Sequence, residues 1–256
     1  MNDRLPVDDI RGDFEAALQT GAPIVVTAPT GSGKSTRLPL WMDEALDGPI
    51  LVVEPRRVAC RSLAEWLSQQ RDEPVGETIG YTIRFDDRTR PSTRVVFATT
   101  GVVLRMLDDE SSWPFAGVLI DEFHERSWQV DLILAILRIR RQRGDDFALA
   151  LTSATLDAPR LAGELDAELL EATGRTYPVE IDYWGEPAAP RASGLDERVR
   201  DAVEEALSRD ADGDVLVFLP GKGEISDCES ALTSLERDHH FDVVQVHGGL
   251  QSHQMG

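Results

Sequence analysis

The sequence predicts an α/β fold built on a doubly wound parallel sheet, and three observations predict it. Short apolar, β-branched runs recur along the chain, amphipathic helical patterns separate them, and 41% of the 256 residues are hydrophobic. Strands of a parallel sheet are buried on both faces and therefore read as continuous apolar runs. Ligands of such folds bind beyond the carboxyl ends of the strands, so functional residues are expected directly after these runs.

The elements expected in the first part of the chain alternate regularly. Strands are predicted over 24–27, 50–54, 94–99, 118–120 and 147–151, and helices over 35–46, 58–70, 102–107 and 129–141. Gly174 and Pro178 indicate a linker over 173–178, because glycine and proline commonly lie in turns and loops between helices and strands. We therefore expect one domain over 1–175.

The alternation restarts beyond this linker. Strands are predicted over 179–183, 215–219 and 243–246, and helices over 195–209 and 224–237. Part of a second α/β domain is therefore expected over 176–256.

The composition excludes several classes of protein. No apolar run approaches the ~18 residues that cross a bilayer, and the charged N-terminus does not resemble a signal peptide. The two cysteines, Cys60 and Cys228, give no disulfide or zinc framework and fit a reduced compartment. We expect a cytoplasmic protein with no membrane partner.

The net charge argues against a nucleic-acid partner when it is taken alone. The 26 basic and 46 acidic residues sum to −20, whereas a generic polyanion-binding surface is basic. Such an acidic, lysine-poor surface would suit a salt-rich cytoplasm or simply reflect a GC-rich genome. Evidence for nucleic acid must therefore come from individual residues.

A glycine-rich loop follows the first predicted strand, over residues 28–36 (Ala-Pro-Thr-Gly-Ser-Gly-Lys-Ser-Thr). It fits the phosphate-binding P-loop pattern, with Ala28 in place of the first glycine. Backbone N–H groups of such a loop surround phosphate oxygens, a lysine reaches the β- and γ-phosphates, and a hydroxyl ligates Mg²⁺. The residues expected to bind the nucleotide are Thr30, Gly31, Ser32, Gly33, Lys34, Ser35 and Thr36, with Ser35 as a magnesium ligand. The alternative is an ordinary Gly/Ser-rich turn.

Two acidic residues directly follow the predicted strand 118–120. Asp121 is expected to hold Mg²⁺ through water, and Glu122 to orient or deprotonate the attacking water. The alternative is a charged loop after a strand. Because a phosphate loop is present in the same chain, we expect Lys34, Asp121 and Glu122 to form one catalytic site.

Six motifs resemble those of the DEAH-box helicases of superfamily 2, which are ATP-dependent RNA helicases. The motifs occur along the chain in the same order as in that family. They are Asp-Glu-Phe-His at 121–124, Glu-Pro-Arg-Arg-Val-Ala at 54–59, Gly-Tyr-Thr-Ile-Arg-Phe at 80–85, Thr-Thr-Gly-Val-Val-Leu-Arg at 99–105, Ser-Ala-Thr at 153–155 and Val-Phe-Leu-Pro-Gly-Lys-Gly-Glu-Ile at 217–225. Phe123, Glu54 and the last motif together are similar to the bacterial HrpB-type branch.

The resemblance implies two RecA-like domains with ATP between them and a single RNA strand held by its backbone. It assigns Arg56, Thr99, Thr100, Gly101, Gly221 and Lys222 to RNA, Ser153 and Thr155 to coupling, and His124 to the γ-phosphate region. A few well-placed hydrogen-bond donors can bind the phosphates of an RNA backbone even when the remaining surface is acidic. The negative net charge therefore does not exclude RNA binding.

Two departures from the family pattern are informative. Trp66 stands where such helicases usually place an arginine against adenine, so we expect it to stack on the base, or else to pack into the core beside Leu63 and Leu67. The sequence also holds no Gln-x-x-Gly-Arg-x-Gly-Arg segment, from which the arginine fingers would come, so we expect a fragment with weak hydrolysis. A nucleotide-gated RNA-binding module with little turnover and a DNA-directed translocase remain the alternatives.

Overall fold

The computed structural model describes residues 4–108, 113–154, 157–174, 179–183, 194–209, 213–239 and 241–247. The chain forms two compact units, Met1–Pro178 and Val179–Gly256. The expected boundary at 175/176 lies close to this division. Among the described residues no helix is both long and apolar enough to cross a bilayer.

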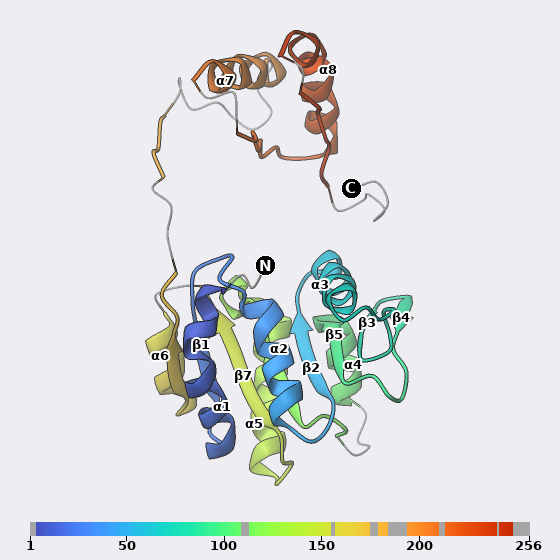
Figure 1. Cartoon of the computed structure of the whole chain (residues 1–256), viewed down its shortest axis with the longest axis vertical. Coiled ribbons are helices and arrows are strands. Elements are labelled where there is room, and N and C mark those ends of the chain that lie inside the picture. The colour runs from blue at the N-terminus through green and yellow to red at the C-terminus, as the bar shows by residue number, and fades with distance from the viewer. Residues whose placement is uncertain are drawn as a thin grey trace. The chain divides into compact units, whose positions relative to one another are not determined.

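An eight-stranded sheet forms the centre of the first unit (Figure 1). Its order is β4-β3-β5-β2-β6-β7-β1-β8, and every neighbouring pair is parallel except β3 and β4. The strands are β1 (Ile24–Thr27), β2 (Ile50–Glu54), β3 (Ile79–Ile83), β4 (Asp86–Arg88), β5 (Val95–Thr99), β6 (Gly117–Ile120), β7 (Ala148–Ser153) and β8 (Glu168–Glu171). The predicted α/β class and all five predicted strands of this part are confirmed, within two residues at each end.

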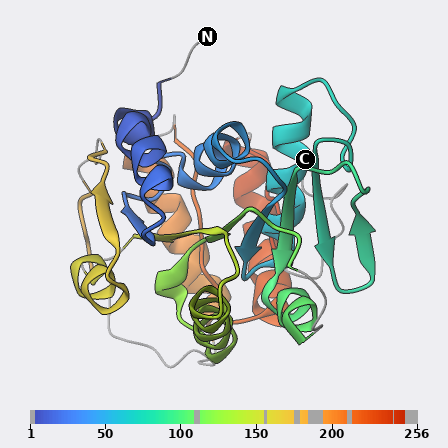
Figure 2. The same cartoon turned by 90° about the horizontal axis from the view of Figure 1, so that it is seen from below.

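Helices cover both faces of this sheet, which Figure 2 shows from below. The helices α1 (Arg11–Thr20), α2 (Lys34–Ala45) and α3 (Arg57–Gln70) pack on one face, and α4 (Thr100–Asp108), α5 (Trp128–Gln142) and α6 (Ala158–Leu165) on the other. Two short 3₁₀ turns, η1 (Pro6–Ile10) and η2 (Phe123–Glu125), complete the unit. Because successive side chains of a strand point to opposite faces, Val52 belongs to one core and Val53 to the other.

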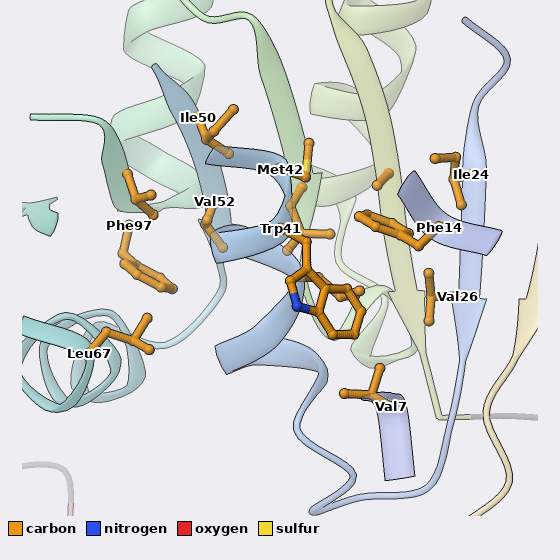
Figure 3. Packing of buried hydrophobic residues seen from close by; sticks show 14 of the residues in the cluster. Val7, Phe14, Ile24, Val26, Trp41, Met42, Ile50, Val52, Leu67 and Phe97 are labelled. Atoms are coloured by element: carbon orange, nitrogen blue, oxygen red, sulfur yellow. The ribbon is translucent and has the colours of Figure 1, made fainter. Parts of the chain in front are cut away.

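The core beneath α2 fixes the helix that follows the phosphate loop. Trp41 and Met42 of α2 point into the sheet face (Figure 3), and the Trp41 and Phe14 rings lie 6.0 Å apart between centroids. Met42 is fully buried and Trp41 is nearly so. Burying side chains of this size stabilises the helix position by about 2 kcal/mol each, so the start of α2 is held rigidly at the sheet edge.

The sequence did not predict the strands β3, β4 and β8. The segment 79–83 contains Gly80, Tyr81 and Thr82, so it does not read as an apolar run, yet it is buried between β4 and β5. A Cβ on Gly80 would lie 2.3 Å from the carbonyl oxygen of Arg88. The glycine therefore permits the close approach of β4, which is too polar and too short to be recognised alone.

The second unit contains two packed helices. They are α7 (Leu195–Arg209) and α8 (Lys222–His239), which bury Val199, Val203, Cys228, Leu232 and Leu235 between them. Both helices were predicted, and the range of α7 is as expected.

The three strands predicted for the second unit were wrong. In the described residues of 179–183, 215–219 and 243–246 no strand forms. A strand needs a hydrogen-bonded neighbour, and here the segments lack that pairing. Their large apolar side chains are largely exposed, with Leu216 at 73% and Phe218 at 88%.

Candidate active site

The phosphate loop connects β1 to α2 at the carboxyl edge of the sheet. Gly31 and Gly33 have φ angles of 74° and 94°, which favour glycine. The N-terminal segment supports the loop from outside, since the Val7 amide donates to the Ser32 carbonyl at 3.1 Å. A Cβ on Gly33 would lie 2.5 Å from Leu5 Cδ1, so the loop and this segment fit together closely. The predicted strand, loop and helix context is present.

Lys34 lies inside this loop. Its side chain is buried, and Nζ donates to the carbonyl oxygens of Ala28 at 2.7 Å and Pro29 at 3.0 Å. Burial lowers the pKa of Lys34, and the negative charges of Glu122 and Asp121 act in the opposite direction. The charges of these two carboxylates therefore act on Lys34.

The other loop residues surround this lysine at the start of α2. Thr30 and Gly31 are exposed, Ser32 is buried, and Ser35 and Thr36 are half-buried. The Thr36 hydroxyl donates to the Gly33 carbonyl at 3.0 Å.

Asp121 follows β6 and is buried between the ends of its two neighbours. Its amide donates to the Val53 carbonyl at 2.9 Å, and its Oδ1 accepts the Thr152 hydroxyl. The other oxygen, Oδ2, is buried and has no hydrogen-bond partner among the described residues. A buried carboxylate oxygen without a donor is costly, so a ligand from outside the protein would stabilise this atom.

Magnesium fits this requirement. Mg²⁺ prefers hard oxygen ligands, usually one or two from the protein with waters and substrate phosphates completing the set. In the described parts of the chain no three His, Cys, Asp or Glu side chains gather into a metal cage. The Ser35 hydroxyl and the Asp121 carboxylate are the protein oxygens that would hold the ion.

Glu122 is held in an unusual backbone conformation. Its φ and ψ of 49° and 40° are left-handed, and its amide donates to Thr152 Oγ1 at 3.0 Å and Asp121 Oδ1 at 3.1 Å. Burial and the neighbouring Asp121 charge raise the pKa of Glu122. A raised pKa makes a carboxylate a stronger base, as the predicted role in activating water requires.

Thr152 is a site residue that the sequence analysis missed. Its hydroxyl donates to Asp121 and accepts from the Glu122 amide, so one side chain orients the Asp121 carboxylate and fixes the Glu122 backbone. The signal was available in part, because Thr152 directly precedes the Ser-Ala-Thr motif. Its contact, however, depends on the pairing of β7 with β6, which the sequence does not show.

His124 joins the acidic box to the Ser-Ala-Thr motif. Its Nδ1 lies 3.3 Å from the Ala154 amide nitrogen and 3.3 Å from Glu122 Oε2. Ser153, at the end of β7, is buried beside β1. Thr155, the other predicted coupling residue, lies outside the described residues.

The residues expected to contact RNA differ in exposure. The Arg56 side chain is 70% exposed and Gly101 is exposed, whereas Thr99 and Thr100 are buried at the end of β5 and the start of α4. Gly221 and Lys222 lie at the start of α8 in the second unit.

Trp66 does not pack into the core. It is 44% exposed on α3, while its neighbour Leu67 is 1% exposed. The core alternative for Trp66 was therefore wrong, and its ring is available to a ligand.

A second missed residue, Glu54, ends β2 beside the carboxylates. It is 2% exposed, and its Oε1 accepts the Arg56 amide at 3.2 Å. Burial, reinforced by the charges of Asp121, Glu122 and Glu125, raises the pKa of Glu54 to about 8. Glu54 is therefore protonated at neutral pH, which limits the negative charge next to Asp121.

This raised pKa predicts a pH-dependent cost of folding. In the unfolded chain Glu54 loses its proton near its ordinary pKa of 4.5, whereas the folded chain retains it to about 8. Wild-type stability should therefore fall between these values and level off above them. Glu54→Gln does not titrate and keeps the acceptor for Arg56, so its free energy of unfolding should exceed that of the wild type increasingly from pH 5 to 8.5, by more than about 1 kcal/mol.

Urea unfolding at a series of pH values measures this difference. The control is Glu65→Gln, which removes an exposed carboxyl from α3. A Glu54→Gln profile parallel to the wild type would show that Glu54 is ionised in the folded protein.

Comparison with known proteins agrees with this geometry. Residues 13–162 match the DEAD/DEAH box helicase family. The chain is 40% identical to ATP-dependent RNA helicase HrpB of Escherichia coli over 90% of the chain and 29% of that protein. It is 34% identical to ATP-dependent RNA helicase HrpA of the same organism, over 98% of the chain and 20% of HrpA.

A solved structure described as Escherichia coli DEAH/RHA helicase HrpB superimposes with a TM-score of 0.85 and 37% identity, covering 98% of this chain and 32% of that one. The chain thus spans less than a third of the length of these relatives. The matched sheet is RecA-like, as predicted. With its phosphate loop, its Asp-Glu-Phe-His box and this match over more than half its length, the chain belongs to the DEAD/DEAH box helicase family.

Proposed function

We propose that the chain is the ATP-binding part of an ATP-dependent RNA helicase that couples hydrolysis of Mg-ATP to remodelling of RNA. The observation that carries this proposal is that Lys34, Asp121 and Glu122 all follow parallel strands of one sheet, where the charges of the two carboxylates act on the lysine. The relatives HrpB and HrpA are named ATP-dependent RNA helicases, which supports the choice of substrate.

Each residue has a role that follows from its position. Lys34 would exchange its carbonyl partners for the β- and γ-phosphates, while the loop amides hold the remaining phosphate oxygens. Bound magnesium would neutralise charge on the phosphates. Glu122 would accept a proton from the attacking water. Thr152 would hold the Glu122 backbone and the Asp121 carboxylate in position relative to each other.

The RNA part of the proposal rests on the exposed edge of the first unit. Arg56 presents a guanidinium, and the first turn of α4 presents N–H groups beside Gly101, where a ligand backbone finds open space. Such donors recognise phosphate without reading bases. His124, with Ser153 and Thr155, would connect the γ-phosphate to this edge.

We assign residues 1–175 to a first RecA-like domain and 176–256 to part of a second. The second would contribute Gly221 and Lys222 to the RNA strand. We also propose a cytoplasmic location, which the cysteine usage led us to expect.

Phosphate release with and without single-stranded RNA tests the motor function. We expect slow but RNA-stimulated turnover from the wild-type chain, and a loss of about 100-fold or more in Glu122→Gln, because the base for water is removed. Glu164→Gln, which removes an exposed carboxyl from α6, is the control.

The outcomes separate the candidate functions. RNA binding without turnover in the wild type would favour a nucleotide-gated RNA-binding module. Equal stimulation by a DNA oligonucleotide of the same sequence would favour a DNA-directed translocase. Full activity in Glu122→Gln would contradict the assigned base.

The exposed Trp66 ring predicts a stacking contact with adenine. Trp66→Ala should weaken ATP binding by about three- to tenfold, because an aromatic stacking contact contributes roughly 0.5–1.5 kcal/mol. Trp128→Ala is a matched control, since Trp128 is an exposed tryptophan on α5, which packs on the other face of the sheet. Titration with a fluorescent ATP analogue measures both. Unchanged affinity in Trp66→Ala, or an equal loss in Trp128→Ala, would contradict the stacking role.

A further inference from the structure

Two residues that follow the Asp-Glu-Phe-His box contact the two stretches proposed to bind RNA. Glu125, the last residue of η2, forms an ion pair with Arg56 at the start of α3. Gln129, in the first turn of α5, accepts the Thr100 hydroxyl at 3.3 Å. One short stretch of chain therefore contacts two distant parts of the sequence. Arg56 lies 69 positions from Glu125, and Thr100 lies 29 positions from Gln129.

The main chain of this stretch is fixed at both ends. Glu122 and Arg126 have positive φ angles of 49° and 37°, and Phe123 is buried between them. At the far end, Ser127 caps α5 by accepting the Val130 amide at 3.2 Å. The stretch begins at Glu122, whose amide donates to Asp121 and Thr152, so its start is anchored beside the candidate site.

The contact with Glu125 leaves Arg56 able to bind a ligand. In the described part of the chain the ion pair uses Nη2, and the Arg56 side chain remains 70% exposed. A guanidinium has five N–H donors in a planar fork, so one edge can face Glu125 while another faces a phosphate. The Arg56 backbone is held separately, through its amide on Glu54.

The contact with Gln129 acts on a buried group. Thr100 is 6% exposed, so its hydroxyl is not accessible to a ligand. Its hydrogen bond to Gln129 instead fixes the start of α4. The neighbouring Gly101 is exposed and faces open space. Gln129 therefore holds the first turn of α4 in the position where its N–H groups are presented.

We infer that Glu125 and Gln129 are positioning residues that connect the nucleotide site to the RNA-binding residues, with Glu125 orienting Arg56 and Gln129 orienting the start of α4. This inference rests on the proposed function. It assigns the RNA affinity of the first unit in part to residues that touch neither RNA nor nucleotide. Without Glu125 the Arg56 side chain can sample other orientations, and without Gln129 the first turn of α4 can do so. Phosphate binding must then restrict them again, which costs conformational entropy.

Charge alone makes the opposite prediction for Glu125. Removing a carboxylate near a phosphate-binding arginine reduces repulsion and should strengthen RNA binding. Asp131 separates the two effects, because it forms an ion pair with Arg126 at 3.1 Å and has no contact with Arg56. Asp131→Asn and Glu125→Gln each remove one negative charge from the same region, so their difference isolates the contact with Arg56.

The test is the binding of a fluorescein-labelled single-stranded RNA to the whole chain, followed by anisotropy in the presence of a non-hydrolysable Mg-ATP analogue. Relative to Asp131→Asn, Glu125→Gln should bind RNA about two- to fivefold more weakly. Gln129→Ala should also weaken RNA binding, and both variants should bind the ATP analogue as the wild type does. In the Arg56→Ala background, Glu125→Gln should cause no further loss, because the residue acts through Arg56.

Several results would overturn the positioning role. These are RNA binding by Glu125→Gln as tight as or tighter than by Asp131→Asn, an equal additional loss in the Arg56→Ala background, or a parallel loss of nucleotide affinity. A wild-type chain that fails to bind RNA would contradict the proposed function and the positioning role with it. A wild-type chain that binds RNA while Glu125→Gln matches Asp131→Asn would contradict the positioning role alone.

Discussion

The candidate site of the first unit depends on the electrostatic balance between one buried lysine and two carboxylates whose charges act on it. Lys34 is held by two backbone carbonyl groups, and Asp121 and Glu122 lie near enough to oppose the effect of its burial. Glu54 adds a further acid that burial keeps protonated. An uncompensated charge in such a place is expensive, so the arrangement is consistent with a ligand that brings both anionic phosphates and a cation.

The fold produces this balance through strand order. Parallel strands bring their carboxyl ends to one edge, and β2, β6, β7 and β1 are adjacent there. The residues that follow these strands therefore meet although they lie far apart in sequence. From the same edge, the stretch that leads from the acidic box to α5 reaches the starts of α3 and α4. The residues proposed to bind nucleotide and those proposed to bind RNA are thus connected by contacts inside the first unit.

The sequence predicted the parts of the site that are local in the chain. The phosphate loop and the acidic box each occupy a few consecutive residues after an apolar run, so residue type and spacing were sufficient to place them after β1 and β6. Thr152 and Glu54 were missed because their place beside Asp121 arises from strand pairing, and register is not visible in a single sequence. Trp66 showed a related limit, since helical spacing alone did not decide between an exposed and a buried ring. In the second unit the apolar runs indicated strand propensity but not pairing. The two predicted helices form there, and the described residues of the predicted strands form no strand.

Calorimetric titration of ATP, with and without Mg²⁺, measures the central claim most directly. The unpartnered, buried Oδ2 of Asp121 is the atom assigned to the ion. Asp121→Asn retains an oxygen for the Thr152 hydroxyl but carries no charge. We expect magnesium to strengthen ATP binding by the wild-type chain and to have little effect on binding by the variant. An equal strengthening in both proteins would show that the ion is held elsewhere, and would contradict a single site formed by Lys34 and the carboxylates.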